Sequence, residues 1–203
     1  MIVLGSGCSS INYAVQEKFG REKRDILKSS IENAKDQQEK ASEQFTDALT
    51  SLMDLYQVDG GELESKYKAF SSQYDKSKSR SDGLKDRIKK ADKVANDLFR
   101  EWETELTEIT SSSLRQISAQ KLNQTRSSFG NLMATFRESE GKMDMVLAQL
   151  RDQVLFLKHN LNAQAISGLR TEFQDVENEI LSLIKDINNS IREADAFIQT
   201  LPE

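Results

Sequence analysis

Apolar residues recur along most of this chain at alternating intervals of three and four residues. The first stripe runs through Leu27, Ile31, Ala34, Gln38, Ala41, Phe45, Ala48 and Leu52. Three further stripes run from Leu63 to Ile109, from Leu122 to Leu161 and from Ile166 to Ile198. An average spacing of about 3.5 residues keeps one narrow apolar face toward a partner helix in a left-handed supercoil. The pattern therefore predicts long, coiled-coil-like α-helices.

Clusters of turn-forming residues separate the stripes. In the segment 58–62, two glycines can take a positive φ after a helix end, and Asp59 can cap the next helix. Further on, Ser113 and Gln116 fit a capping box at the start of a third helix. The stripe shifts its phase across the segment 160–163, which a third turn would explain.

These breaks predict helices near residues 12–57, 62–110, 114–161 and 164–200. The single proline, Pro202, interrupts none of them. Connections this short force neighbouring helices to run antiparallel. The sequence thus predicts an all-α fold: an elongated antiparallel coiled-coil-like bundle of about four long helices, forming one domain over residues 11–203. Whether the fourth and shortest helix packs along the whole rod stays open.

Some positions inside the predicted helices are polar or small. Five stripe positions carry polar side chains: Gln38, Ser77, Ser81, Thr125 and Ser139. Three glycines, Gly83, Gly130 and Gly141, also fall within helices, at about 1 kcal/mol each relative to alanine. We interpret these residues as thin or mobile packing in the middle of the rod, with a hinge or a seam for a partner helix as the alternative.

Composition narrows the range of functions. The net charge of −5 and the pI near 5.2 argue against a dedicated nucleic-acid binder, which needs a basic face to displace counterions from phosphate. The basic clusters at 21–24 and 85–90 include acidic residues, as solvated helix faces do. The chain has no run of eighteen apolar residues, so we predict no transmembrane helix.

Catalytic chemistry has few candidate residues. The only histidine, His159, sits beside Asn160 and Asn162 near a predicted helix end, where the helix dipole favours a cation. We therefore interpret His159 as a surface or capping residue rather than a metal ligand or catalytic base. Trp102 lies on an apolar stripe and belongs to the predicted core. The sequence predicts a non-enzymatic protein with no cofactor, no metal site and no small-molecule substrate.

The N-terminal segment is apolar, then small, then polar around Cys8, the only cysteine. A bacterial lipoprotein signal ends in this way, and its cysteine becomes the lipidated first residue of the mature protein. The match is incomplete, because Gly5 stands where leucine is favoured and the apolar stretch is shorter than about 7–15 residues. A start assigned downstream of the true one would explain this. We predict that residues 1–10 are the remnant of a lipoprotein signal and tether, the alternative being a frayed end with an incidental cysteine.

Several segments resemble a bacterial family catalogued as domain of unknown function 2959. They are residues 22–27, 59–67, 98–103 and 152–163, and the last, around His159, is the most specific. The similarity extends from about Tyr13 to Ile198. It supplies no activity for this chain, because none is established for the family. It implies a lipoprotein acylated at Cys8, and Ser9 after it implies sorting to the inner leaflet of the outer membrane, facing the periplasm. It also draws attention to the turn around His159 as an interaction surface.

Two functions of different classes follow. The first is a lipid-anchored periplasmic rod that acts as a structural or interaction protein, bound to the membrane through its anchor and to a protein partner or itself through its helices. The second is a cytoplasmic membrane-remodelling scaffold resembling phage-shock-type helical hairpins. It would lay an amphipathic first helix, around Ile11 to Leu27, on a bilayer.

Overall fold

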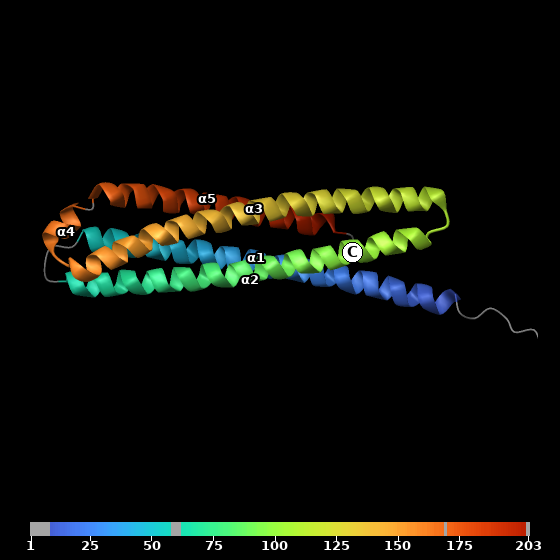
Figure 1. Cartoon of the computed structure of the whole chain (residues 1–203), viewed down its shortest axis with the longest axis horizontal. Coiled ribbons are helices and arrows are strands. Elements are labelled where there is room, and N and C mark those ends of the chain that lie inside the picture. Colours follow the sequence, from blue (N-terminus) through green and yellow to red (C-terminus); the bar gives the residue numbers. More distant parts are fainter. Residues whose placement is uncertain (1–8, 58–61, 169, 202–203) are drawn as a thin grey trace, which may run out of the picture.

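The computed structural model describes the backbone of residues 9–57, 62–168 and 170–201, and the side chains of these residues apart from 9–22 and five positions between 163 and 171. Figure 1 shows the helices. They are α1 (Ser9–Tyr56), α2 (Leu63–Glu108), α3 (Ser112–His159), α4 (Ala163–Gly168) and α5 (Arg170–Thr200). The part of the chain that the structure describes contains no strand.

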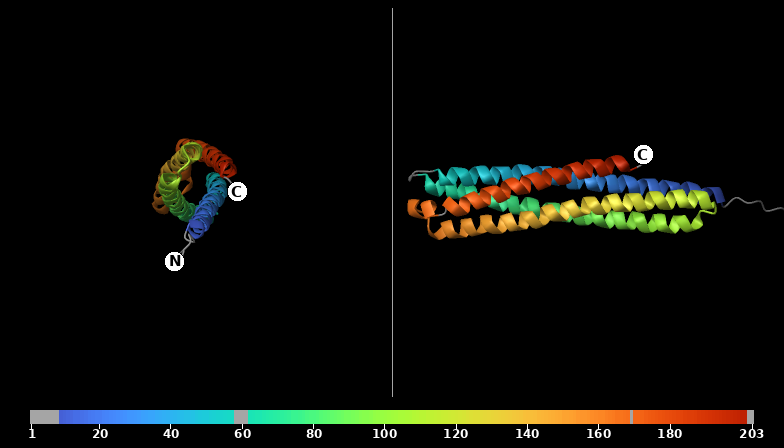
Figure 2. Two further views of the ribbon diagram at one scale, coloured as in Figure 1. Left: turned by 90° about the vertical axis from the view of Figure 1, so that its right-hand side faces the viewer. Right: turned by 90° about the horizontal axis from the view of Figure 1, so that it is seen from above.

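The four long helices form an elongated bundle in which consecutive helices run antiparallel (Figure 1). Viewed down its length, the bundle is a ring in which α1 packs against α2 and α5, and α3 packs against the same two helices (Figure 2). The predicted all-α bundle is therefore confirmed. The predicted fourth helix over 164–200 is instead divided into the short α4 and the longer α5.

The core consists of the predicted apolar stripes. Phe45, Phe70 and Phe136 are fully buried, as are most other stripe residues. The polar stripe positions are buried as well, and Ser77 satisfies its hydroxyl by donating to the carbonyl of Gln73, one turn earlier, at 2.9 Å. Thr125 and Ser139 make the same kind of bond. A hydroxyl can enter a helical core at low cost in this way, because it stays hydrogen-bonded within its own helix.

The glycines inside the helices do not permit a close approach of neighbouring helices. A Cβ atom at Gly130 or Gly141 would meet no atom within 4 Å, and one at Gly83 would meet only the side chain of Gln37, at 3.9 Å. Each of these three glycines therefore has room for a side chain in this structure. Their small size supports no helix–helix contact in this bundle.

The start of α3 differs from the prediction. The predicted capping box of Ser113 and Gln116 is wrong, because α3 begins at Ser112 and its N-cap is Ser111. The Ser111 hydroxyl accepts a bond from the Leu114 amide at 3.5 Å. Residues 111–113 are three consecutive serines with the same capping chemistry, so local sequence does not distinguish between them. Asp59, the other predicted cap, lies outside the described residues.

The last helix covers only part of the rod. α5 has 31 residues and α1 has 48, which correspond to about 47 Å and about 72 Å. Both figures show α5 ending part-way along the bundle while α1, α2 and α3 continue (Figures 1 and 2). The question left open by the sequence is answered: the fourth helix packs along part of the rod only.

The fold tests only part of the predictions about membranes. No helix among the described residues has the length and apolar character needed to span a bilayer. The amphipathic face predicted for residues 11–27 falls mostly on side chains outside the described part, so that alternative stays a prediction. From Leu27 onward, α1 is packed into the bundle core.

Candidate functional site

The turn after α3 is held by two asparagines. The backbone amide of Asn160 donates to the carbonyl oxygen of Phe156 at 3.1 Å, and its side-chain amide donates to the same oxygen at 3.0 Å. The Asn162 amide then donates to the Asn160 carbonyl at 2.9 Å, and the Asn162 carbonyl accepts from Ile166 in α4 at 3.2 Å. The two asparagines therefore terminate one helix and begin the next, which is a structural task.

His159 is the last residue of α3 and is exposed. Its neighbour Lys158 is exposed too, and both lie in the last turn, where the carbonyl ends of the helix favour positive charge. The interpretation of His159 as a surface residue is confirmed. The structure brings His159, Asn160 and Asn162 together in one turn, as the sequence predicted.

Two apolar side chains lie exposed next to this turn. Leu155 and Phe156 are 51% and 43% exposed. Sequence reasoning missed them, although both lie off the apolar stripe formed by Val154, Leu157 and Leu161. An apolar residue off the stripe must point away from the helix partner, and that signal could have identified this pair.

A polar contact beneath the turn ties three helices together. The hydroxyl of Tyr56, at the end of α1, donates to the side-chain oxygen of Gln153 on α3 at 2.6 Å. The Tyr56 ring packs against Phe173 of α5 with 4.7 Å between ring centroids. Burial, together with the nearby charge of Glu172, raises the pKa of Tyr56 well above its ordinary value. The hydroxyl therefore stays protonated and can donate this hydrogen bond.

Among the residues that the structure describes, no three histidine, cysteine or acidic side chains lie close enough together to hold a metal ion. Trp102 is half-buried against the core, as predicted, and its ring nitrogen donates to Ser118 at 2.9 Å.

Cys8, the predicted lipidation residue, lies outside the described residues. α1 begins with the next residue, at the end of the rod opposite α4 (Figure 1).

The chain was compared with models of known protein families. A family model described as "Protein of unknown function (DUF2959)" matches residues 12–201. The chain belongs to this family. The match includes the turn around His159 and all of the bundle except the first three residues of α1. The family resemblance noted in the sequence is therefore confirmed. No curated protein and no solved structure matches this DUF2959 chain.

Proposed function

We propose that this DUF2959 protein is a non-enzymatic, lipid-anchored rod that holds an interaction surface at a distance from a membrane. The anchor is a lipid on Cys8, and the compartment is the periplasm, at the inner leaflet of the outer membrane. The interaction surface is the turn around His159 with its exposed apolar neighbours. Each part of the proposal rests on a different feature of the chain.

The path of α1 is the observation that carries the proposal. α1 begins at Ser9, next to Cys8 in sequence, and runs without interruption to Tyr56 near the turn. Its 48 residues correspond to about 72 Å. A lipid on Cys8 would therefore attach to one end of a continuous helix, and the His159 turn lies at the other end of the bundle (Figure 1). This geometry suits a spacer.

The strength of the anchor follows from the chemistry of lipidation. A single acyl chain gives marginal membrane binding, whereas two or more chains give stable attachment. A bacterial lipoprotein cysteine carries a diacylglycerol, which meets this requirement. The rod itself then needs no membrane-spanning helix.

The chemistry of the turn suits a protein contact. Phe156 and Leu155 offer exposed apolar surface, and Lys158 and His159 lie beside them. Aromatic anchors bordered by polar residues are typical of protein interfaces. The hydrogen bonds of Tyr56 and Asn160 hold this surface in one conformation, which lowers the entropy cost of binding.

Metabolic labelling tests the anchor. The full-length protein, expressed in a Gram-negative bacterium with any upstream signal restored, should incorporate an alkyne-bearing palmitate analogue. Cys8→Ser should lose the label, and the neighbouring Ser10→Ala should keep it. Equal labelling of Cys8→Ser and the unaltered protein would refute the tether.

A further inference from the structure

The contacts between α1 and α2 determine which of their residues lie at the same level of the rod. Asp54 of α1 pairs with Lys66 of α2 at 3.1 Å. Further along, the side-chain oxygen of Gln37 lies 3.9 Å from the place of a Cβ atom on Gly83. Between these two contacts both helices advance by seventeen residues. The two helices therefore keep one register along this part of the rod.

A row of cations follows the edge of α2 that borders α1. Gln73 lies on that edge, because its side chain accepts a hydrogen bond from Gln44 of α1 at 2.8 Å, and Gly83 lies on it too. Residues seven apart share one face of a coiled-coil helix. Four exposed cations of α2 lie one or two heptads from Gln73 or Gly83, and a fifth lies one turn from Gln44 on α1: Lys76, Arg80, Arg87, Lys90 and Lys40. We call these five residues the basic row.

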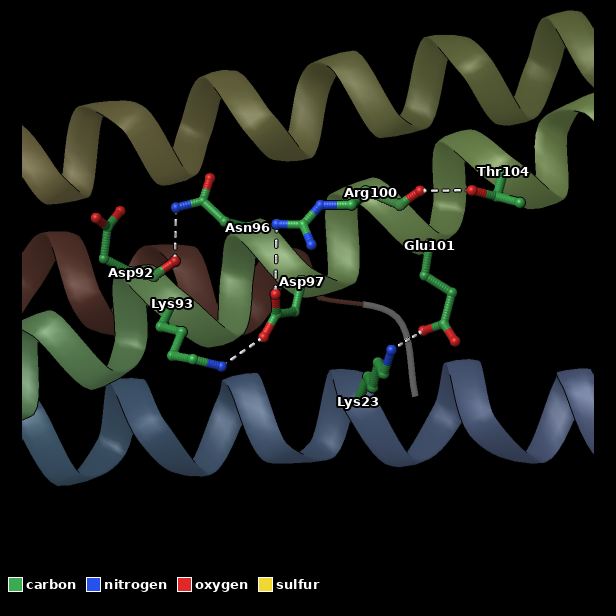
Figure 3. Close-up of polar contacts among 8 residues, drawn as sticks. All are labelled: Lys23, Asp92, Lys93, Asn96, Asp97, Arg100, Glu101 and Thr104. Carbon is green, nitrogen blue, oxygen red and sulfur yellow. Dashed lines mark hydrogen bonds and ion pairs between the residues drawn. The ribbon is translucent and has the colours of Figure 1, made fainter.

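The basic row lacks acidic partners, whereas the charges next to it are paired. None of its five side chains forms an ion pair with a residue that the structure describes. Just beyond the row, Lys93 and Arg100 both contact Asp97, at 2.9 and 3.5 Å (Figure 3). Beside the row, Lys78 pairs with Asp82 at 3.0 Å. The basic row is therefore free to pair with another molecule.

α1 carries a row of carboxylates on a different edge. Its members are exposed and follow each other at intervals of four, three and four residues, which places them on one face: Glu32, Asp36, Glu39 and Glu43. This face adjoins Lys35, which pairs with Asp195 of α5 at 2.8 Å. The hydrogen bond to Asp195 raises the pKa of Lys35, and the nearby charges of Glu39 and Asp36 add to that effect. None of the four carboxylates forms an ion pair with a described residue. We call them the acidic row.

The register of α1 and α2 places the two rows at the same levels of the rod. Three pairs of opposite charge match in level to within about 3 Å: Glu43 with Lys76, Glu39 with Arg80, and Glu32 with Arg87. Within one chain the two rows lie on different edges, one toward α5 and one along α2. A neighbouring copy that points the same way, without a shift along the rod axis, brings its acidic row opposite the basic row with all three pairs in register. Complementary charge of this kind favours one partner and one orientation.

We propose that copies of this protein associate side by side and point in the same direction, with the acidic row of one copy against the basic row of the next. The contact is heterologous, so each pair of copies still offers one free row of each charge and further copies can add. The inference rests on the proposed tether, because anchors in one membrane give all the rods the same direction and the same height.

The tether also decides whether the contact forms. Exposed ion pairs are individually weak, and three of them fall short of millimolar affinity in free solution. Attachment to a shared surface raises the effective concentration to about the millimolar range. We therefore expect association on a membrane and monomers in dilute solution.

Zero-length cross-linking on vesicles tests the contact with the full chain. Cys8, the only cysteine, is coupled to phosphatidylcholine vesicles that carry maleimide-bearing lipid. Isotope-labelled and unlabelled protein are mixed in equal amounts, so that mass spectrometry recognises links between copies. A carbodiimide then joins lysines to carboxylates that lie at ion-pair distance. We expect a link from Lys76 to Glu43 of another copy, at least about 5-fold more abundant on vesicles than in solution at equal protein concentration.

Charge reversals locate the contact without altering the two linked residues. Arg80→Glu with Arg87→Glu should lower the yield of this link at least about 5-fold, because two of the three pairs become repulsive. The matched control, Lys185→Glu with Arg192→Glu, reverses two exposed cations of α5 that are also seven residues apart. It changes the net charge equally and should alter the yield less than about 2-fold. Circular dichroism should show unchanged helix content in both variants.

A second reversal should restore the contact. Adding Glu32→Arg and Glu39→Arg to the chain that carries Arg80→Glu and Arg87→Glu reverses both members of two pairs. The link should then return to within about 2-fold of its original yield, because every pair is attractive again. Failure of this rescue in a folded protein would contradict the pairing of the two rows.

Other results would overturn the proposal. Links confined to single copies, or equal yields for the reversed variant and its control, would remove the contact or its charge dependence. A dominant link from Lys76 to Glu32 of another copy would mean that the rods run in opposite directions. Binding of uncoupled protein to phosphatidylglycerol vesicles that Arg80→Glu with Arg87→Glu abolishes would assign the basic row to a membrane surface. The coupling of Cys8 is chemical here, so a failure of lipid labelling in cells would refute the tether separately.

Discussion

Gln38 offers a sharp test of how polar residues in this core affect stability. Its side chain is fully buried in α1, between the buried Ala34 and Ala41 of the same stripe. Neither Nε2 nor Oε1 has a hydrogen-bond partner among the described residues. Unlike Ser77 or Ser139, whose hydroxyls bond to their own helix, this buried amide makes no hydrogen bond to a described residue that would replace its bonds to water.

The size of the expected stabilisation follows from the two unpaired groups of the Gln38 amide. Each buried, unsatisfied donor or acceptor costs about 1–3 kcal/mol, and leucine of similar shape carries neither. We expect Gln38→Leu to raise the free energy of unfolding by about 2–4 kcal/mol. For a chain of this size each kcal/mol raises Tm by about 2–4 °C, so Tm should rise by at least about 4 °C. Polar core residues commonly specify helix register at a cost in stability, which would explain the glutamine.

Urea titration and thermal melting, both followed by circular dichroism at 222 nm, measure the change. The control is Gln174→Leu, an exposed glutamine on α5, for which the change should stay within about 0.5 kcal/mol. The m-value should be equal for all three proteins, showing that the same surface is exposed on unfolding. If Gln38→Leu is no more stable than the unaltered protein, the amide is hydrogen-bonded in solution and the reasoning is wrong.

Three further predictions concern single residues. Burial and neighbouring carboxylates raise the pKa of Glu105 in the folded protein. Its contribution to stability is therefore full below the ordinary glutamate pKa and is lost as pH rises through the raised pKa. Glu105→Gln should raise Tm more at pH 7 than at pH 4, and an equal rise at both pH values would contradict this. Tyr56→Phe leaves the buried oxygen of Gln153 without its donor and should cost about 1–2 kcal/mol in urea unfolding, with no loss expected if water replaces the hydroxyl. Ser111→Ala should lower stability by about 0.5–1 kcal/mol and Ser113→Ala by less, in parallel thermal melts, and the opposite order would return the cap to Ser113.

Sequence periodicity correctly predicted the buried residues and the turns where the contacts are local or repeat along a helix. The stripe residues Leu27, Phe45 and Phe136 are all buried, because a 3.5-residue repeat has only one face on which they can lie. The turn at His159 was placed correctly from a shift in the phase of the stripe. The cap of α3 was misplaced by two residues, because three consecutive serines have the same local chemistry.

The sequence by itself determined that this protein is a bundle of long antiparallel helices, where its turns fall and which side chains form the core. Those properties depend on spacing along one chain, which helix geometry converts directly into faces. Only the tertiary structure decided that α5 stops short of the rod's end. It also decided that Gln38 lacks a partner while Lys35 finds one in Asp195. Such pairings join residues far apart in sequence, and their register is set by how whole helices pack against each other.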